Sequence, residues 1–424
     1  MTHGILQDKD AFKINIRQED DQSNNCKEFF EKGLSALLAD EHFLLLYVPE
    51  IGGRMQIVRP ASDPYHRQRM IQKINEAKGV PSFYYALSHL WGLTENNRYH
   101  WNEIADFVDD EDGQPVKPVS MRPAKRDTLL ALLQDHPDSY WWIDVLCART
   151  DTPLDIMGDI YSCCLECVAM IDGDPNLIPQ LYTLMMDVKQ EFPTYYNMDR
   201  NDILNCKQND KRLSKATELV FALMQRKWWK RVWTWQEMAL PFGDVRLVPE
   251  SGTHQPLSKT ITVDALLDYF QANFRVDHVA HALEPIDSET GLTNAMTLHA
   301  WFTEILHARK SNEHRTGKKR AQEFSYLVSS FSDSPRRCMD PADYVYGVLG
   351  VFQFKIPRMN DPNAVWHYFL SELDNYMETT GMKNDKFSGK RITGINDNAY
   401  RIDLRKAKDM ADVYKDDLLE MTFC

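Results

Sequence analysis

The chain has 424 residues, 43% of them hydrophobic, which is typical of a globular protein with ample material for a large core. Its formal net charge of −13 implies a surface that repels phosphate backbones, so we expect no nucleic-acid partner. The eight cysteines lack the regular spacing of a disulfide framework, and we expect reduced thiols. The N-terminus carries charges throughout, and no apolar stretch is long enough to span a bilayer. We therefore expect a cytoplasmic protein without a membrane span.

Short apolar runs alternate with helical patterns in the first half of the chain. Residues 26–39 carry apolar side chains at helical spacing, and residues 43–50 form an apolar run that indicates a buried strand. The runs YYALS, YWWIDVL and CVAMID have strand length and composition, and helices are predicted at 155–165 and 214–227. Buried strands that alternate with helices favour a parallel sheet covered on both faces. The sequence therefore predicts an α/β core.

The composition divides the chain into three predicted parts. Residues 1–74 form an N-terminal extension that packs on the core, and residues 75–245 form the core itself, with a polar insertion near 175–212. Residues 246–424 are mainly helical, with helices predicted at 263–274, 297–309, 321–331, 344–352 and 364–379. The basic segment 314–320 is interpreted as a solvated connector, with a localisation signal as the alternative.

Four motifs lie in order between residues 84 and 352. The first is YYALSHLWG at 84–92, and the second is WIDVLC at 142–147, followed by ART at 148–150. The third is RVWTWQE at 231–237, and the fourth is RRCMDPADYVYGVLG at 336–350. In this order the motifs resemble the heterokaryon-incompatibility (HET) domain family of filamentous fungi. His89 replaces that family's usual tyrosine, and ART departs from its Ile-Asn-Gln. The resemblance implies an effector of self/non-self recognition and programmed cell death.

The third motif is predicted to lie on a helix over 228–239, with Trp233 and Glu237 on one face and Trp229 one turn back. The HET family is distantly similar to TIR domains, many of which have Trp and Glu at this spacing. That resemblance implies a TIR-like or flavodoxin-like parallel sheet with flanking helices. It also implies that Glu237 is the catalytic carboxylate of an NAD nucleosidase, acting through an oxocarbenium-like state. NAD would then be the substrate, and no cofactor is expected. The structural alternative is that Glu237 caps the helix or pairs with a neighbouring cation.

Five residues are predicted to bind substrate: Ser88, Trp91, Asp144, Arg231 and Trp233. Trp233 would stack on a base, Arg231 would meet a phosphate, and Asp144 follows a strand, where open α/β sheets place ligands. Their structural alternatives are a core tryptophan, an ion-paired arginine and an aspartate that caps the next helix. Around Ser88 there is no Gly-x-Ser-x-Gly elbow, which argues against a serine hydrolase.

No metal site is predicted. Only two of the cysteines 163, 164 and 167 can share a helical face, and no second ligand pair follows them at a regular distance. His278 and His281 are interpreted as a solvated helix face, with no glutamate between them. Cys147 is interpreted as a buried thiol, with a nucleophile as the alternative, because no base is evident beside it.

Three classes of function are left open. An NAD hydrolase needs a water-excluding cleft that holds Glu237. A non-enzymatic module that signals death by assembly needs a partly apolar exposed surface and tolerates a buried Glu237. The third class is a hydrolase of another small nucleotide. The expected partners are therefore NAD or a related nucleotide, a second copy of the chain in a homo-oligomer, or an unidentified protein.

Overall fold

The computed structural model describes residues 13–14, 16, 24–94, 97–191, 211–252, 256–273, 298, 301–306, 308–309, 336–379, 392–393, 399–402 and 419–421. The chain forms two compact units. Unit 1 comprises Met1–Met170 and Pro241–Val245, and unit 2 comprises Ile171–Leu240 and Arg246–Cys424. The division at residues 74 and 245 stays a prediction. The predicted helix 321–331, the basic segment 314–320, His278 and His281 lie outside the described residues.

Unit 1 is built on three parallel strands with aromatic and aliphatic side chains. Strand β3 (Tyr84–His89) pairs in parallel with β9 (Ser139–Ile143) on one side and with β10 (Glu166–Ile171) on the other. All five residues of β9 are buried, as expected for a strand covered on both faces. The spatial order β9-β3-β10 corresponds to order 2-1-3 along the chain, as in flavodoxin-like sheets. The predicted α/β fold with a parallel sheet is confirmed.

Further strands extend this sheet. Strand β1 (Leu45–Val48) pairs antiparallel with β9 and with β2 (Met55–Val58), and β2 pairs in parallel with β7 (Val108–Asp109). The full order is β12-β11-β10-β3-β9-β1-β2-β7, where β11 (Val245–Pro249) and β12 (Ile261–Thr262) are antiparallel. The small strands are β4 (Leu93–Thr94) with β5 (Asn97–Arg98), and β6 (His100–Trp101) with β8 (Val119–Ser120).

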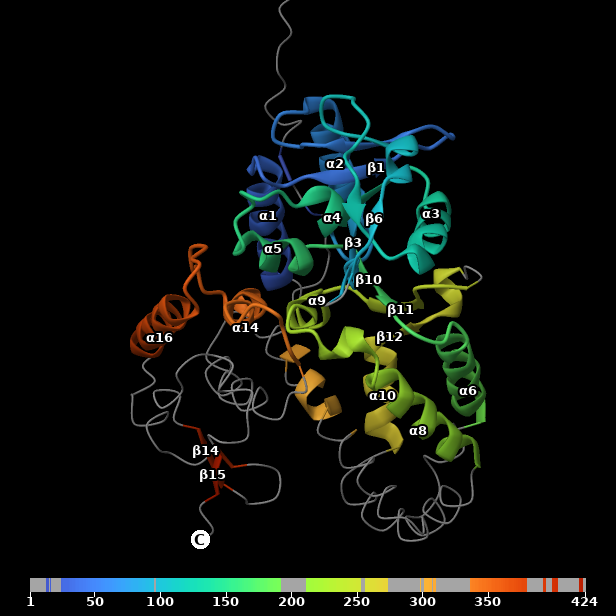
Figure 1. Cartoon of the computed structure of the whole chain (residues 1–424), viewed down its shortest axis with the longest axis vertical. Coiled ribbons are helices and arrows are strands. Elements are labelled where there is room, and N and C mark those ends of the chain that lie inside the picture. Colours follow the sequence, from blue (N-terminus) through green and yellow to red (C-terminus); the bar gives the residue numbers. More distant parts are fainter. Residues whose placement is uncertain are drawn as a thin grey trace, which may run out of the picture. The chain divides into compact units, whose positions relative to one another are not determined.

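Helices cover the strands of unit 1 from two sides. Figure 1 shows α1 (Asn24–Ala39) and α5 (Ile156–Ser162) on one side of β3, and α3 (Arg126–Gln134) on the other. The remaining helices are α2 (Pro64–Glu76), α4 (Asp144–Cys147) and the 3-10 turns η3 (Glu103–Asp106) and η4 (Pro123–Lys125). A Cβ added at Gly33 of α1 would lie 2.6 Å from Cys163 Sγ, so this glycine permits the close approach of the two segments.

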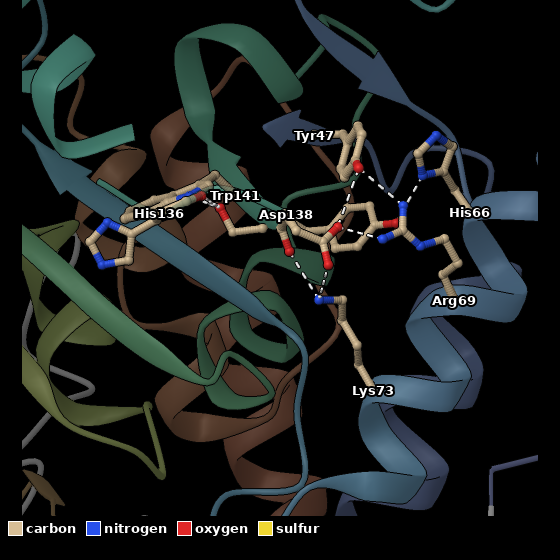
Figure 2. A network of polar contacts seen from close by, with 9 residues as sticks. Tyr47, His66, Arg69, Lys73, His136, Asp138 and Trp141 are labelled. Atoms are coloured by element: carbon tan, nitrogen blue, oxygen red, sulfur yellow. Dashed lines mark hydrogen bonds and ion pairs between the residues drawn. The ribbon is translucent and has the colours of Figure 1, made fainter. Parts of the chain in front are cut away.

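The turn before β9 is fastened to helix α2 by a charged network (Figure 2). Asp138 has a φ of 53°, in the left-handed region that aspartate tolerates better than most residues. Its carboxylate accepts from the Arg69 guanidinium and, at 2.9 Å, from Lys73 Nζ, which also donates to the Asp138 carbonyl. The Tyr47 hydroxyl, on β1, lies 3.2 Å from the same carboxylate and accepts from Arg69. The network therefore joins β1, α2 and the start of β9.

Unit 2 is mainly helical in the described ranges, as predicted for the C-terminal region. Helices α6 (Leu177–Glu191) and α8 (Lys211–Met224) lie side by side (Figure 1). The other helices are η6 (Lys227–Lys230), α9 (Thr234–Ala239), η7 (Leu257–Lys259), α10 (Val263–Asn273), α14 (Asp343–Tyr346), α15 (Leu349–Phe352) and α16 (Pro362–Thr379). An unpredicted antiparallel sheet contains β13 (Ile392–Thr393), β14 (Ala399–Ile402) and β15 (Leu419–Met421).

Two features of unit 2 differ from the predicted helices. The segment 344–352 was predicted as one helix but forms two short ones, α14 and α15, with Gly347 and Val348 between them. A Cβ at Gly347 would lie 2.5 Å from a methyl carbon of Val232, so the chain passes too close for a longer side chain there. Among the described helices, none has the length and apolarity required to cross a bilayer.

Candidate functional site

The carboxyl ends of β3 and β9 bring together a buried polar cluster in unit 1. His89 ends β3 and Asp144 follows β9, and because the strands are parallel neighbours these ends meet at one edge. His89 Nε2 lies 2.9 Å from Asp144 Oδ1, and the Trp91 indole N–H donates to Asp144 Oδ2. The Val145 amide donates to Asp144 Oδ1 at 2.7 Å. Asp144 therefore accepts from three groups and also bonds the first turn of α4.

Lys125 completes this cluster and was not predicted as a site residue. It is fully buried, with Nζ 2.8 Å from His89 Nδ1 and bonded to the Leu90 carbonyl. His89 Nδ1 also lies 3.1 Å from the Leu90 carbonyl. A lysine ammonium only donates hydrogen bonds, so its contact with Nδ1 corresponds to the tautomer in which Nε2 carries the proton towards Asp144. Burial, and after it the charge of Lys125, lowers the pKa of His89. The cluster thus places the Lys125 amine, the His89 imidazole and the Asp144 carboxylate in series.

The three predicted binding residues of unit 1 differ in accessibility. Trp91 is 41% exposed, whereas Ser88 is 1% exposed and lies in β3 opposite Ala169 of β10. The Asp144 side chain is 12% exposed. A ligand at this edge of unit 1 would therefore meet the Trp91 ring before the Asp144 carboxylate.

The third motif does not form the single helix predicted over 228–239. The turn η6 ends at Lys230, Arg231 is extended with ψ 137°, and α9 begins after Trp233. A main-chain bridge to Arg337 interrupts the helix at this point. The Val232 amide donates to the Arg337 carbonyl at 3.2 Å, and the Arg337 amide donates to the Lys230 carbonyl at 2.6 Å. Trp229 therefore does not continue the helical face of Trp233 and Glu237, and that part of the prediction is wrong.

Arg231 and Trp233 face an acidic residue of the fourth motif. The Trp233 side chain is hydrogen-bonded to Asp343, and the Arg231 charge acts on the same carboxyl. Burial raises the pKa of Asp343, and these two groups partly offset that rise. The Trp233 side chain, predicted to contact substrate, thus links the third motif to the fourth.

Helix α9 buries two polar side chains in succession. Glu237 is 5% exposed and Gln236 is fully buried. Neither amide atom of Gln236 has a hydrogen-bond partner among the described residues. Unsatisfied buried polar groups are rare in folded proteins and costly, so they often mark functional positions. Sequence reasoning singled out Glu237 but missed Gln236, whose burial depends on tertiary packing.

A small cavity of about 10 Å³ lies in unit 2, lined by Met224, Trp229, Trp301, Glu304, Ile305 and Arg336. That volume holds about one water molecule, so this cavity is not a dinucleotide site. Neither Trp233 nor Glu237 lines it.

The thiol and metal predictions concern buried residues of unit 1. Cys147 is fully buried, and burial raises the pKa of its thiol to about 12, which favours the inert interpretation over a nucleophile. Within the described ranges, no group of three or more His, Cys, Asp or Glu side chains could hold a metal ion.

A family model described as "Heterokaryon incompatibility protein (HET)" matches residues 84–237, which include the first three motifs. Residues 84–237 are therefore similar to the HET domain family. The HET domain contributes Ser88, Trp91 and Asp144 from unit 1, and Arg231, Trp233 and Glu237 from unit 2. The fourth motif lies beyond the matched range.

The chain is also similar to "Heterokaryon incompatibility protein 6, OR allele" of Neurospora crassa, at 23% identity over 312 residues. The similar region covers 64% of this chain and 43% of that relative, so the chain spans less than half of the relative's length. No solved structure matches the chain.

Proposed function

We propose that this chain is an effector of fungal non-self recognition whose action leads to programmed cell death. The observation that carries this proposal is the HET domain over residues 84–237. A relative whose name is that of a heterokaryon incompatibility protein supports it. The order of the β9-β3-β10 strands fits the α/β core implied by the resemblance to this family.

For the chemistry, we propose hydrolysis of the nicotinamide–ribose bond of NAD, with Glu237 as the carboxylate that stabilises the oxocarbenium-like state. Two features of α9 support this assignment. Glu237 follows Trp233 at the spacing implied by the TIR resemblance, and its neighbour Gln236 keeps a buried amide without a partner among the described residues. A buried carboxylate beside an unsatisfied amide is an arrangement that a polar ligand would stabilise.

The low exposure of Glu237 favours a second candidate function, a non-enzymatic module that signals by assembly. At 5% exposure the carboxylate meets a dinucleotide only after its surroundings open. A module that acts by assembly has no such requirement. Self-association fits both candidates, because a second copy can open or complete a site as well as transmit a signal.

The test is consumption of NAD by the purified full chain at high concentration, comparing wild type with Glu237→Gln. Glu218→Gln is the matched control, because Glu218 is an exposed residue of α8 that makes a surface contact with Lys215. We expect release of nicotinamide by wild type and by the control, and none by Glu237→Gln. Parallel reactions with ATP and ADP-ribose test a hydrolase of another nucleotide.

Expression in a fungal host separates the two candidates. Death caused by wild type but not by Glu237→Gln, together with NAD loss, supports the enzyme. Death caused equally by both proteins, without loss of any nucleotide, assigns the chain to the assembly class. Viable cells at full expression of a folded wild-type chain would contradict the effector role itself.

A further inference from the structure

Helix α9, which carries Glu237, is too short to be stable by itself. It has six residues, Thr234–Ala239, and isolated helices of this length are not stable in water because nucleation is costly. Its position must therefore be set by contacts from elsewhere in the chain. Within unit 2 the structure shows such contacts at both of its ends.

Arg336 holds the first turn of α9. Its Nη1 donates to the Arg231 carbonyl at 3.0 Å and to the Thr234 hydroxyl, which itself donates to the same carbonyl at 2.7 Å. The guanidinium carbon lies 4.7 Å from the centre of the Trp235 ring, within cation–π range. Arg336 is 2% exposed, so these contacts are shielded from water.

Arg309 holds the last turn of the same helix. Its Nη1 donates to the Met238 carbonyl at 2.8 Å. A cation that bonds a carbonyl at the carboxyl end of a helix also interacts favourably with the helix dipole. Glu237 therefore lies between two segments of main chain that are each tied to an arginine.

Each arginine is itself fixed by a carboxylate. Arg336 Nε pairs with buried Glu304 at 3.5 Å, and Arg309 makes two contacts with Asp264, at 2.7 and 2.6 Å. Glu304 lies in the helical residues 301–306 and Arg309 in the helical residues 308–309, so residues near one another along the chain serve both ends of α9. A carboxylate partner restricts the rotamers of a long side chain and aims its remaining donors.

We propose that Arg336 and Arg309 are positioning residues that clamp α9 from both ends and so fix the Glu237 carboxylate. The clamp draws on residues outside the 84–237 range matched by the family model, so the working unit of the HET domain extends at least to Arg336. The clamp itself rests on the contacts of unit 2, whereas its effect on turnover rests on the NAD hydrolysis proposed above.

Lysine is the informative replacement at both positions. It keeps the charge, but its single ammonium cannot reproduce the planar fork that bonds α9 and a carboxylate at once. The matched control is Arg246→Lys, because Arg246 also donates to a main-chain carbonyl of unit 2, that of Leu257 at 3.0 Å, which lies outside α9.

The experiment measures amide hydrogen exchange of peptides covering residues 232–240, together with kcat and KM for NAD. For Arg336→Lys and Arg309→Lys we expect exchange in α9 to become about tenfold faster or more, with other helices of unit 2 unchanged. We expect kcat to fall about tenfold and KM to change little, since a displaced Glu237 weakens the transition state more than substrate binding. Arg246→Lys should match wild type in both measurements.

Unchanged exchange of α9 in both lysine variants would overturn the clamp. A rise of kcat in those variants would also overturn it, because the arginines would then restrain Glu237 instead of positioning it. If α9 exchanges faster in the lysine variants but the wild-type chain does not consume NAD, the clamp is supported and the proposed NAD hydrolysis is contradicted. If Arg336→Lys fails to fold, Asp264→Asn loosens only the Arg309 end, where the Asp264 side chain is 42% exposed, and gives the same readouts.

Discussion

Replacement of Asp138 tests how much the charged network of Figure 2 stabilises unit 1. Asp138→Asn keeps a side chain that tolerates a positive φ, so its effect reports the loss of charge. Asp138→Ala also loses the charge and adds the penalty of a left-handed conformation, since its φ is 53°. Asp138→Gly loses the charge without that penalty, although glycine makes the unfolded chain more flexible.

The expected magnitudes follow from exposure and geometry. The side chains of Arg69 and Asp138 are 28% and 29% exposed, and Lys73 is 35% exposed. Pairs of this kind contribute about 0.2–1 kcal/mol each, so Asp138→Asn should lower the free energy of unfolding by about 1 kcal/mol. Asp138→Ala should lower it by about 2–3 kcal/mol, because a non-glycine residue in the left-handed region costs about 1–2 kcal/mol more.

The same network predicts a pH dependence. Burial raises the pKa of the Asp138 carboxyl, but the hydrogen bond and charge of Lys73 and the charge of Arg69 outweigh burial and leave the pKa below its ordinary value of 3.8. As the pH falls, the unfolded chain therefore takes up this proton before the folded chain does. The stabilisation is present above the ordinary pKa and is lost as the pH falls towards the folded pKa.

Urea unfolding at several pH values provides the assay, with wild type, the three variants and Asp151→Asn as an exposed charge control. The difference between wild type and Asp138→Asn should be constant near neutrality and shrink below about pH 4. Equal losses for Asn and Ala would refute the reasoning about φ. A difference between wild type and Asp138→Asn that does not change with pH would refute the electrostatic part.

Three further predictions concern buried groups of unit 1. Burial lowers the pKa of His89, so just below pH 6.5 the unfolded chain binds a proton that the folded chain does not, and the free energy of unfolding rises with pH. His89→Gln should make this rise smaller. An unchanged slope in the variant would contradict this prediction. Gly33→Ala should lower the free energy of unfolding by about 1–3 kcal/mol, because the added methyl group overpacks against Cys163. Adding Cys163→Ala should recover much of that loss of stability. If the two substitutions have additive effects, the contact between these residues is excluded. Cys147 should resist a thiol reagent until unit 1 unfolds, since its pKa is raised to about 12; fast labelling of the native chain would refute its burial.

The strands of the core could be predicted because nearly all of their side chains are buried. The runs that became β3, β9 and β10 contain aromatic and aliphatic residues without the alternation of a half-exposed strand. Length and composition were sufficient there, as they were for the helix Val263–Asn273. The antiparallel pairing of β1 was not predictable in this way, since a run of four apolar residues contains no information on its direction.

The residues that organise the candidate sites were less predictable because their partners are distant along the chain. The break at Arg231 depends on a main-chain bridge to Arg337, which no local pattern indicates. Lys125 lies in a charged stretch, PAKRD, that is typical of a solvated helix start, and only the fold buries it against His89. Motif order identified the family and the segments involved, whereas tertiary contacts decide what each side chain does.

The complete burial of Lys125 also determines when its amine can be chemically modified. Acylating reagents and lysine-modifying enzymes reach the ammonium only in a chain whose unit 1 has opened. An acylated Lys125 would lose its charge and would no longer fit between His89 Nδ1 and the Leu90 carbonyl, so the opened state could not close again. Acylation of Lys125 would therefore trap each chain that opens, and the rate of this labelling would report the rate at which unit 1 unfolds.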